Sequence, residues 1–219
     1  MNPYCRNALN GLKKRLELGN GFIYNQDDEG EVVKESCSFS EGISSAAILD
    51  FEKSLQKELP PDYTDFLKVH NGANLFQTEY SMGLEIFPLE HIPTVIDGLQ
   101  ALELPNHWLP LAYHDSYTGY IYMDLNKAKG RKSNYLLFAE LCDMNEPTYL
   151  QCNFEMFIER FIMVQGNNYW DWHLITAENA YNKPIDFNPE TSIYQPDENY
   201  YKESFHMIES EYENTKRKT

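Results

Sequence analysis

The residues of this chain that could do chemistry include six histidines: His70, His91, His107, His114, His173 and His206. A histidine base needs a group to orient it, and Asp115 stands next to His114. Adjacent residues of a strand point to opposite faces, so this pair does not predict one catalytic site. His70 comes just before the expected end of a helix. A partial positive charge on its imidazole would be favourable there, because the free carbonyl groups of a helix C-terminus are partly negative.

Other catalytic and cofactor signatures are missing from the sequence. No serine lies in a Gly-x-Ser-x-Gly turn, and no glycine-rich phosphate loop occurs. The acidic run Asp27-Asp28-Glu29, with Glu31, lacks the ligand spacing of an EF-hand and predicts a solvated turn. We therefore expect a protein that is not an enzyme and that carries no zinc, flavin or nucleotide cofactor.

The cysteines indicate a reducing compartment. They are scattered along the chain without a Cys-x-x-Cys pair or a histidine at zinc-ligand spacing, at Cys5, Cys37, Cys142 and Cys152. Such cysteines are typical of reduced, mostly buried thiols in the cytoplasm. No secretory signal and no run of about 18 apolar residues is present, so we expect no membrane span.

The charge is strongly acidic and unevenly distributed. The net charge is −16, and no lysine or arginine occurs between Lys68 and Lys127. Seven acidic residues fall in that interval: Glu79, Glu85, Glu90, Asp97, Glu103, Asp115 and Asp124. An acidic surface repels phosphate backbones and attracts basic proteins, so direct nucleic-acid binding is disfavoured. Solubility is the alternative reason for this acidity.

Two short helices are expected within residues 43–76. The first has apolar residues at helical spacing, with Ser44 or Ser45 as its N-cap. The second begins near Pro61 and carries a second apolar face. Gly72 is predicted to end it as a left-handed C-terminal cap.

This block resembles the SUKH superfamily, which is named partly for the fungal Smi/Knr cell-wall regulators. The family pattern is an acidic-aromatic helix, Leu-Pro-x-Asp/Glu-Tyr, a Phe-Leu helix and Asn-Gly-Gly. The matching residues are Glu52, Leu59, Pro60, Asp62, Tyr63, Phe66, Leu67, Asn71 and Gly72. Ala73 stands at the position of the second family glycine.

The resemblance continues downstream. Residues 108–112 and 119–124 are similar to the paired central strands of the family, with matches at Trp108, Pro110, Gly119, Tyr122 and Asp124. Asn153 is expected to cap a helix, and residues 153–166 resemble the closing helix of the family. The resemblance covers about residues 39–165. It implies an α+β fold with a central, mainly antiparallel sheet and helices packed on one side. It also implies a binding protein, because the family shares no catalytic apparatus.

The resemblance carries two expectations about function. Most members are bacterial immunity proteins that neutralise secreted toxins, many of which are nucleases, so we expect this chain to bind and block a basic protein toxin. The alternative is an intracellular regulator or scaffold, as the fungal relatives imply. We expect carboxylates to steer the partner and aromatic rings to anchor it. The residues chosen for this role are Glu79 with Tyr80, and Asp115 with Tyr117.

Three regions are expected along the chain. Residues 1–38 form an N-terminal helix and hairpin extension, with Leu9, Leu12 and Leu16 on one side of the helix. Residues 39–182 form the SUKH-like α+β domain. Residues 183–219 form a C-terminal arm rich in proline and tyrosine, where the prolines argue against regular structure.

Two aromatic groups leave alternatives open. Tyr120 and Tyr122 alternate on one strand and share a face, which is either core or a polar-aromatic groove. The cluster Tyr169-Trp170-Asp171-Trp172-His173 is either an interface or the attachment of the last helix to the core, and we favour attachment.

Overall fold

The structure is a computed structural model that describes residues 1–26, 32–102, 104–129, 134–142 and 147–170. The chain divides into two units, residues 1–172 and 173–219, and all described residues belong to the first. The predicted C-terminal arm, residues 183–219, lies outside the described residues.

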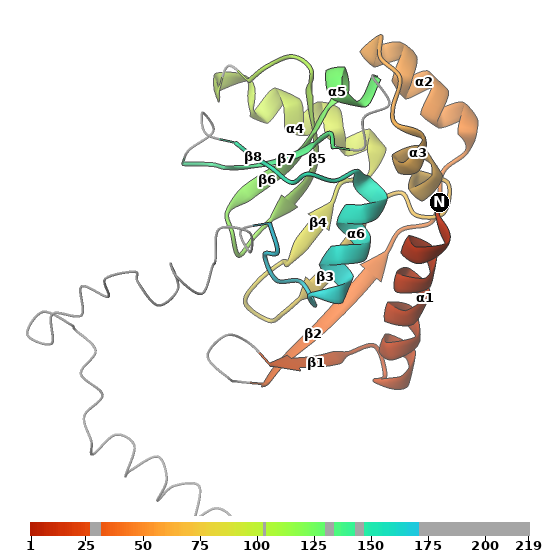
Figure 1. Ribbon diagram of the computed structural model, residues 1–219, viewed down its shortest axis with the longest axis vertical. Helices are drawn as coiled ribbons and strands as arrows, with labels where there is room; N and C mark the ends of the chain where they lie inside the picture. The colour runs from red at the N-terminus through yellow and green to blue at the C-terminus, as the bar shows by residue number, and fades with distance from the viewer. Residues whose placement is uncertain (27–31, 103, 130–133, 143–146, 171–219) are drawn as a thin grey trace, which may run out of the picture. The chain divides into compact units, whose positions relative to one another are not determined.

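One antiparallel sheet forms the centre of the described unit (Figure 1). Its strands follow one another in chain order, and each pairs antiparallel with the next. They are β1 (Ile23–Gln26), β2 (Val32–Phe39), β3 (Ala73–Gln77), β4 (Leu84–Ile86), β5 (Trp108–His114), β6 (Gly119–Asp124), β7 (Leu136–Glu140) and β8 (Thr148–Tyr149). The predicted α+β class with an antiparallel sheet is confirmed.

Helices lie between and around these strands. Within the described residues they are α1 (Pro3–Leu18), α2 (Ser45–Leu55), α3 (Pro61–Leu67), α4 (Ile92–Gly98), α5 (Leu125–Lys129) and α6 (Phe154–Met163), with two 3-10 turns, η1 (Leu89–His91) and η2 (Gln100–Leu102). Side-chain caps explain where three of them begin. Asn2, Ser44 and Asn153 each accept a hydrogen bond from a first-turn backbone N–H, of α1, α2 and α6 respectively.

The first face of the sheet holds the main core. Figure 1 shows α1 beside α6 on this face, and α3 also contacts α6. The predicted apolar side of the N-terminal helix is confirmed, because Leu9, Leu12 and Leu16 are buried together with Cys5. Helix α6 buries its apolar side in the same core, where Phe157 and Phe161 are fully enclosed.

The second face of the sheet is only partly covered. Leu99, which follows α4, packs with Tyr122, Leu137 and Ala139 in a smaller core on this face. The helices α1, α3 and α6 share one face as expected, whereas α4 and η2 lie over the other. The expectation of helices on one face only was incomplete, because β6 and β7 carry large apolar side chains on both faces. The side chains on the second face must also be buried, and α4 and η2 cover them.

A bulge in β5 changes which residues face each core. Pro110 pairs with Tyr122, while Ala112 pairs with Ile121, so Leu111 is an extra residue in the strand. Beyond the bulge, His114 points into the main core and Tyr113 points to the second face.

Gly72 adopts the predicted left-handed conformation, with φ +98°, but it does not cap the helix. Helix α3 ends at Leu67, and Gly72 belongs to the turn that leads into β3. A side chain there would place its Cβ 2.8 Å from the carbonyl oxygen of Ile86. Glycine is therefore required by both conformation and space.

Three local elements of the structure are not evident from the sequence. Residues 73–77 form β3. Residues 92–93 begin α4, because a proline is tolerated in the first helical turn. The residues from Lys127 to Lys129 belong to α5.

Candidate partner-binding surface

Asp62 of the Leu-Pro-Pro-Asp-Tyr motif is an architectural residue. Its Oδ2 accepts hydrogen bonds from the Tyr135 hydroxyl at 2.6 Å and from the Phe154 N–H at 3.0 Å. The N–H of Glu155 lies 3.4 Å from the same oxygen. Asp62 thus places a carboxylate at the N-terminus of α6, where negative charge is favourable. Burial, and then the Asp62 charge, raise the pKa of Tyr135, so its hydroxyl stays a donor.

Two other polar motif residues fasten loops. The Glu52 carboxylate accepts the N–H of Leu59 at 2.7 Å, which closes the joint between α2 and α3. The Asn71 side chain accepts the N–H of Leu89 at 2.9 Å and donates to Glu90 at 2.7 Å. This bond from Asn71 lowers the pKa of Glu90. Both residues hold backbone in place instead of facing solvent.

The motif residues in the central hairpin are also structural. Asp124 accepts the N–H groups of Asn126 and Lys127, each at 3.0 Å, and so caps α5. Gly119 packs against Phe138, whose ring a Cβ would meet at 2.5 Å. The remaining motif residues near α3 are buried: Leu59, Pro60, Tyr63, Phe66 and Leu67.

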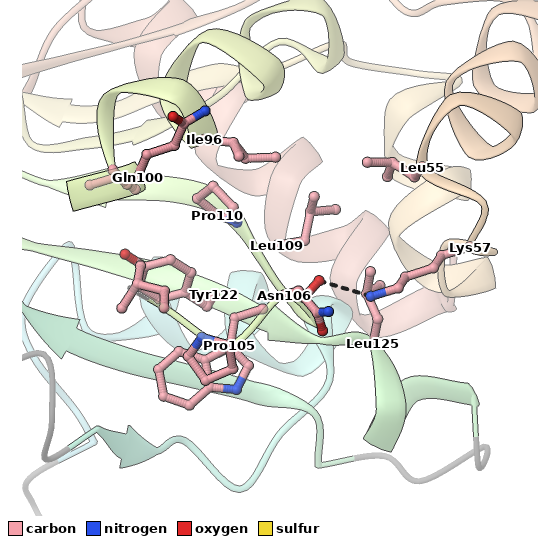
Figure 2. Close-up of a pocket in the computed structure, with 13 residues that line it drawn as sticks. Leu55, Lys57, Ile96, Gln100, Pro105, Asn106, Leu109, Pro110, Tyr122 and Leu125 are labelled. Atoms are coloured by element: carbon pink, nitrogen blue, oxygen red, sulfur yellow. Dashed lines mark hydrogen bonds between the residues drawn. The ribbon is translucent and has the colours of Figure 1, made fainter. Parts of the chain in front are cut away.

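A pocket lies on the second face, between the end of α2, α4 with η2, and the start of β5 (Figure 2). It has a volume of about 500 Å³ and is lined mainly by apolar side chains, including the motif residues Trp108, Pro110 and Tyr122. Lys57 crosses its edge and donates to the carbonyl oxygen of Asn106 at 2.8 Å. The Tyr122 hydroxyl and Trp108 Nε1 are buried and make no hydrogen bond within the described residues.

The loops that carry the four predicted partner-binding residues lie side by side. One is the β3–β4 loop, residues 78–83, and the other is the β5–β6 turn, residues 115–118. The Asp115 carboxylate accepts the N–H of Met82 at 3.0 Å, and the hydroxyls of Ser81 and Ser116 are 3.1 Å apart. We call these two segments the paired loops.

The four residues predicted to bind a partner lie on the paired loops, where three have at least part of the side chain exposed and the fourth, Tyr117, packs against the main core. Glu79 is exposed, and the Tyr80 side chain is 92% exposed. Asp115 is half-buried because it braces the neighbouring loop. Tyr117 instead packs against His114, with ring centroids 4.6 Å apart, and its hydroxyl accepts the N–H of Asn168 at 3.1 Å. The structure thus brings Glu79, Tyr80 and Asp115 to one end of the sheet and gives Tyr117 a packing role.

His114 and Asp115 do not form a catalytic pair. His114 lies in the main core beside Phe161 and Trp170, while Asp115 bonds within the paired loops. Burial lowers the pKa of His114 to about 4. His70 also differs from expectation: its Nδ1 lies 3.1 Å from the carbonyl oxygen of Ser40, and its Nε2 lies 2.6 Å from Lys13 Nζ. It joins α1 to the β2–α2 connection instead of serving a helix end.

The described residues offer neither a metal-ligand cluster nor a membrane-spanning helix. In these segments no group of three or more His, Cys, Asp or Glu side chains could hold a metal ion. The same segments hold no helix with the length and apolar character needed to cross a bilayer. Trp170 is buried against Phe138 and Phe157, as the attachment hypothesis predicted, while Asp171, Trp172 and His173 lie outside the description.

One group on the second face was not selected from the sequence. Glu85, Tyr113 and Tyr120 are neighbours in successive strands, because Glu85 pairs with Tyr113 and Tyr113 pairs with Tyr120. All three are half-buried, and the two rings are 5.0 Å apart. Burial, with smaller contributions from Tyr113 and Glu85, raises the pKa of Tyr120. Strand alternation identifies Tyr120, but the pairing of distant strands that adds Glu85 is not visible in the sequence.

Fold and motif together define a class of protein, namely an α+β domain whose signature residues cap helices, form turns and fill the core. A sequence model of the SMI1 / KNR4 family (SUKH-1) matches residues 42–160, which is more than half of the chain. The chain belongs to this family, and the predicted resemblance is confirmed. Members of the family typically bind partner proteins.

Two proteins of Bacillus subtilis (strain 168) are similar to this chain. The uncharacterized protein YobM is 32% identical over 187 residues, which cover 83% of this chain and 98% of YobM. The uncharacterized protein YnaB is 29% identical over 133 residues, which cover 61% of this chain and 85% of YnaB. The similarity to YobM is longer than the segment that matches the family, so it includes residues flanking that segment.

Proposed function

We propose that this protein is a cytoplasmic immunity protein that binds and neutralises a basic protein toxin without catalysis. Membership of a family that typically binds partner proteins supports a binding role. The toxin class follows from charge: a nuclease must be basic to hold nucleic acid, and an acidic inhibitor complements it.

The observation that carries the proposal is the composition of the paired loops. They present Glu79 and a Tyr80 side chain that is 92% exposed, and Asp115 braces them. No lysine or arginine occurs from Val69 to Asn126, so this end of the sheet has no cation of its own in either loop. An exposed aromatic ring among carboxylates suits an interface in which charge guides the partner and the ring is buried on contact.

The charges and the ring have different roles in this proposal. Exposed ion pairs contribute little affinity, on the order of 0–1 kcal/mol each. Glu79 and Asp115 therefore raise the association rate and favour basic partners, whereas Tyr80 anchors the complex. Tyr117 packs its ring against His114 and accepts a hydrogen bond from Asn168, and these contacts hold the β5–β6 turn in place.

The test is to identify a toxin domain among the products of the neighbouring genes and to co-express it with this protein. The proposal predicts that the protein restores growth and elutes with the toxin domain as one complex in size-exclusion chromatography. The variant Tyr80→Ala should weaken that complex, while Tyr4→Ala, which changes an exposed tyrosine on α1, should not. Absence of both complex and rescue would contradict the proposal. Binding of several defined endogenous proteins instead would favour the regulator or scaffold function.

A further inference from the structure

On the second face of the sheet, the described residues leave the side chains of β2, β3 and β4 half-buried or exposed, and this part is called the open part. The cover begins at β5 and β6. The side chains that point to this open part are mostly polar, at Ser36, Ser38, Asn74 and Glu85. Tyr113 and Tyr120 form the border between the open part and the core under Leu99. Glu85, Tyr113 and Tyr120, which we call the outer row, cross three adjacent strands at one level.

Glu85 is the carboxylate of the outer row, and no described residue pairs with it. Among the described residues its side chain makes no hydrogen bond and no ion pair, although it is half-buried. Partly buried carboxylates are normally paired, because burial weakens their hydration. Lys34 of β2, a lysine on this face of the sheet, lies over the ring of Phe22 at 3.7 Å. Glu85 is thus free to take a cation from another molecule.

Two aromatic rings stand beside this carboxylate. Directly opposed residues of antiparallel strands have Cβ atoms about 4.5–5.5 Å apart, which places Glu85 next to Tyr113. The tilted Tyr113 and Tyr120 rings, with planes at 56°, form a shallow aromatic corner. Aromatic faces attract cations, and a flat guanidinium can stack on a ring while its N–H groups meet a carboxylate in a bidentate pair.

We propose that the outer row is a binding site for an arginine side chain of the protein partner. This inference rests on the proposed function, because it names the chemical group by which the basic partner is recognised. Arginine fits better than lysine, whose compact ammonium pairs with a carboxylate but does not stack as a plane. The strands of the outer row lead directly into the paired loops, since β4 follows residues 78–83 and β5 and β6 flank residues 115–118. One partner surface can therefore contact both.

The site can be tested without the toxin. Capped Gly-Arg-Gly tripeptide is titrated into the full-length protein labelled with ¹⁵N, with Gly-Lys-Gly and the neutral Gly-citrulline-Gly as comparisons. The expected result is a saturable shift of the amide signals of Glu85, Tyr113 and Tyr120, largest for arginine and absent for citrulline. Equal shifts with arginine and citrulline, or arginine-dependent shifts only elsewhere, would overturn the proposal.

Matched variants separate the carboxylate from the rings. Glu85→Gln should weaken arginine binding by roughly fivefold or more, whereas Glu17→Gln, an equal charge change on α1, should leave it unchanged. Tyr113→Leu should weaken binding and Tyr113→Phe should retain it, because phenylalanine keeps the aromatic face. Thermal melting checks that each variant is folded. Binding that is equal in wild type, Glu85→Gln and Tyr113→Leu would contradict the site.

The toxin complex then distinguishes the two proposals. If the toxin binds and Glu79→Lys weakens binding while Glu85→Gln and Tyr113→Leu do not, the arginine site is wrong and the immunity function stands. If the outer row binds the arginine tripeptide but no toxin binds the protein, the immunity function is wrong and the site is retained.

Discussion

The Asp62 carboxylate accepts a hydrogen bond from the N–H of Phe154, a residue 92 positions further along the chain, at a distance of 3.0 Å. This contact joins the Leu-Pro-Pro-Asp-Tyr motif to the closing helix α6. Tyr135, which directly precedes β7, donates its hydroxyl hydrogen bond to the same carboxylate oxygen. The most recognisable acidic residue of the family pattern therefore organises the core.

The first prediction follows from that contact. Asp62→Ala removes an acceptor from the Tyr135 hydroxyl and from the first turn of α6, both partly buried. The free energy of unfolding should fall by about 1–3 kcal/mol, as measured by urea denaturation. Asp50→Ala is the control, because Asp50 makes an exposed pair with Lys53 and should cost much less. Equal losses in the two variants would contradict the capping role.

Gly72 gives a second prediction. Gly72→Ala should lower stability by about 1 kcal/mol or more, since its φ is +98° and the added Cβ would press on the Ile86 carbonyl oxygen. Gly98→Ala is the matched control, because nothing lies within 4 Å of a Cβ there. Differential scanning calorimetry should show a lower melting temperature for the first variant alone. An unchanged melting temperature in Gly72→Ala would contradict this description of the turn.

A third prediction concerns the pH dependence of stability. Burial lowers the pKa of His114 from 6.5 to about 4, while the contact with the Gly166 carbonyl oxygen and then the Asp115 charge oppose the shift. Between these pH values the unfolded chain binds more protons at this histidine than the folded protein does. The stabilisation is therefore complete above pH 6.5 and is lost as the pH falls toward 4. The full loss corresponds to about 3 kcal/mol.

Urea denaturation of wild type and His114→Gln at a series of pH values isolates this contribution. Carboxylates titrate in both proteins, so the difference between the two curves reports His114. The wild type should lose more stability than the variant between pH 6.5 and 4. Parallel curves would show that His114 is not a buried neutral imidazole.

The sequence predicts the elements whose periodicity is long or whose caps are distinct. Helix α1 has a clear apolar side, and Ser44 and Asn153 mark the starts of α2 and α6. Strand β3 was not predicted because it is short, and Phe76 interrupts its alternation with a positive φ of 57°. The start of α4 was not predicted because Pro93 is equally typical of a turn and of a first helical turn.

The candidate surface was predictable only in part. Charge distribution selected both paired loops, and their contact in the structure agrees with that selection. The role of Tyr117 was not predictable, because it depends on contacts with Trp170 and Asn168, which lie about 50 residues further along the sequence. Tyr120 and Tyr122 share a face as expected, yet one borders the open surface and the other is core. Leu99, which no local pattern places, covers Tyr122 and decides this difference.

The rate at which the protein associates with its toxin, measured by stopped-flow fluorescence at increasing NaCl concentration, tests the central claim most directly. The account predicts that the rate constant falls roughly tenfold or more between about 0.05 M and 0.5 M salt. Glu79→Lys should lower it further at low salt, while Glu17→Lys, which reverses an exposed charge on α1, should change it little. A rate constant that is insensitive to salt and to Glu79→Lys would contradict the claim that the acidic paired loops receive the partner.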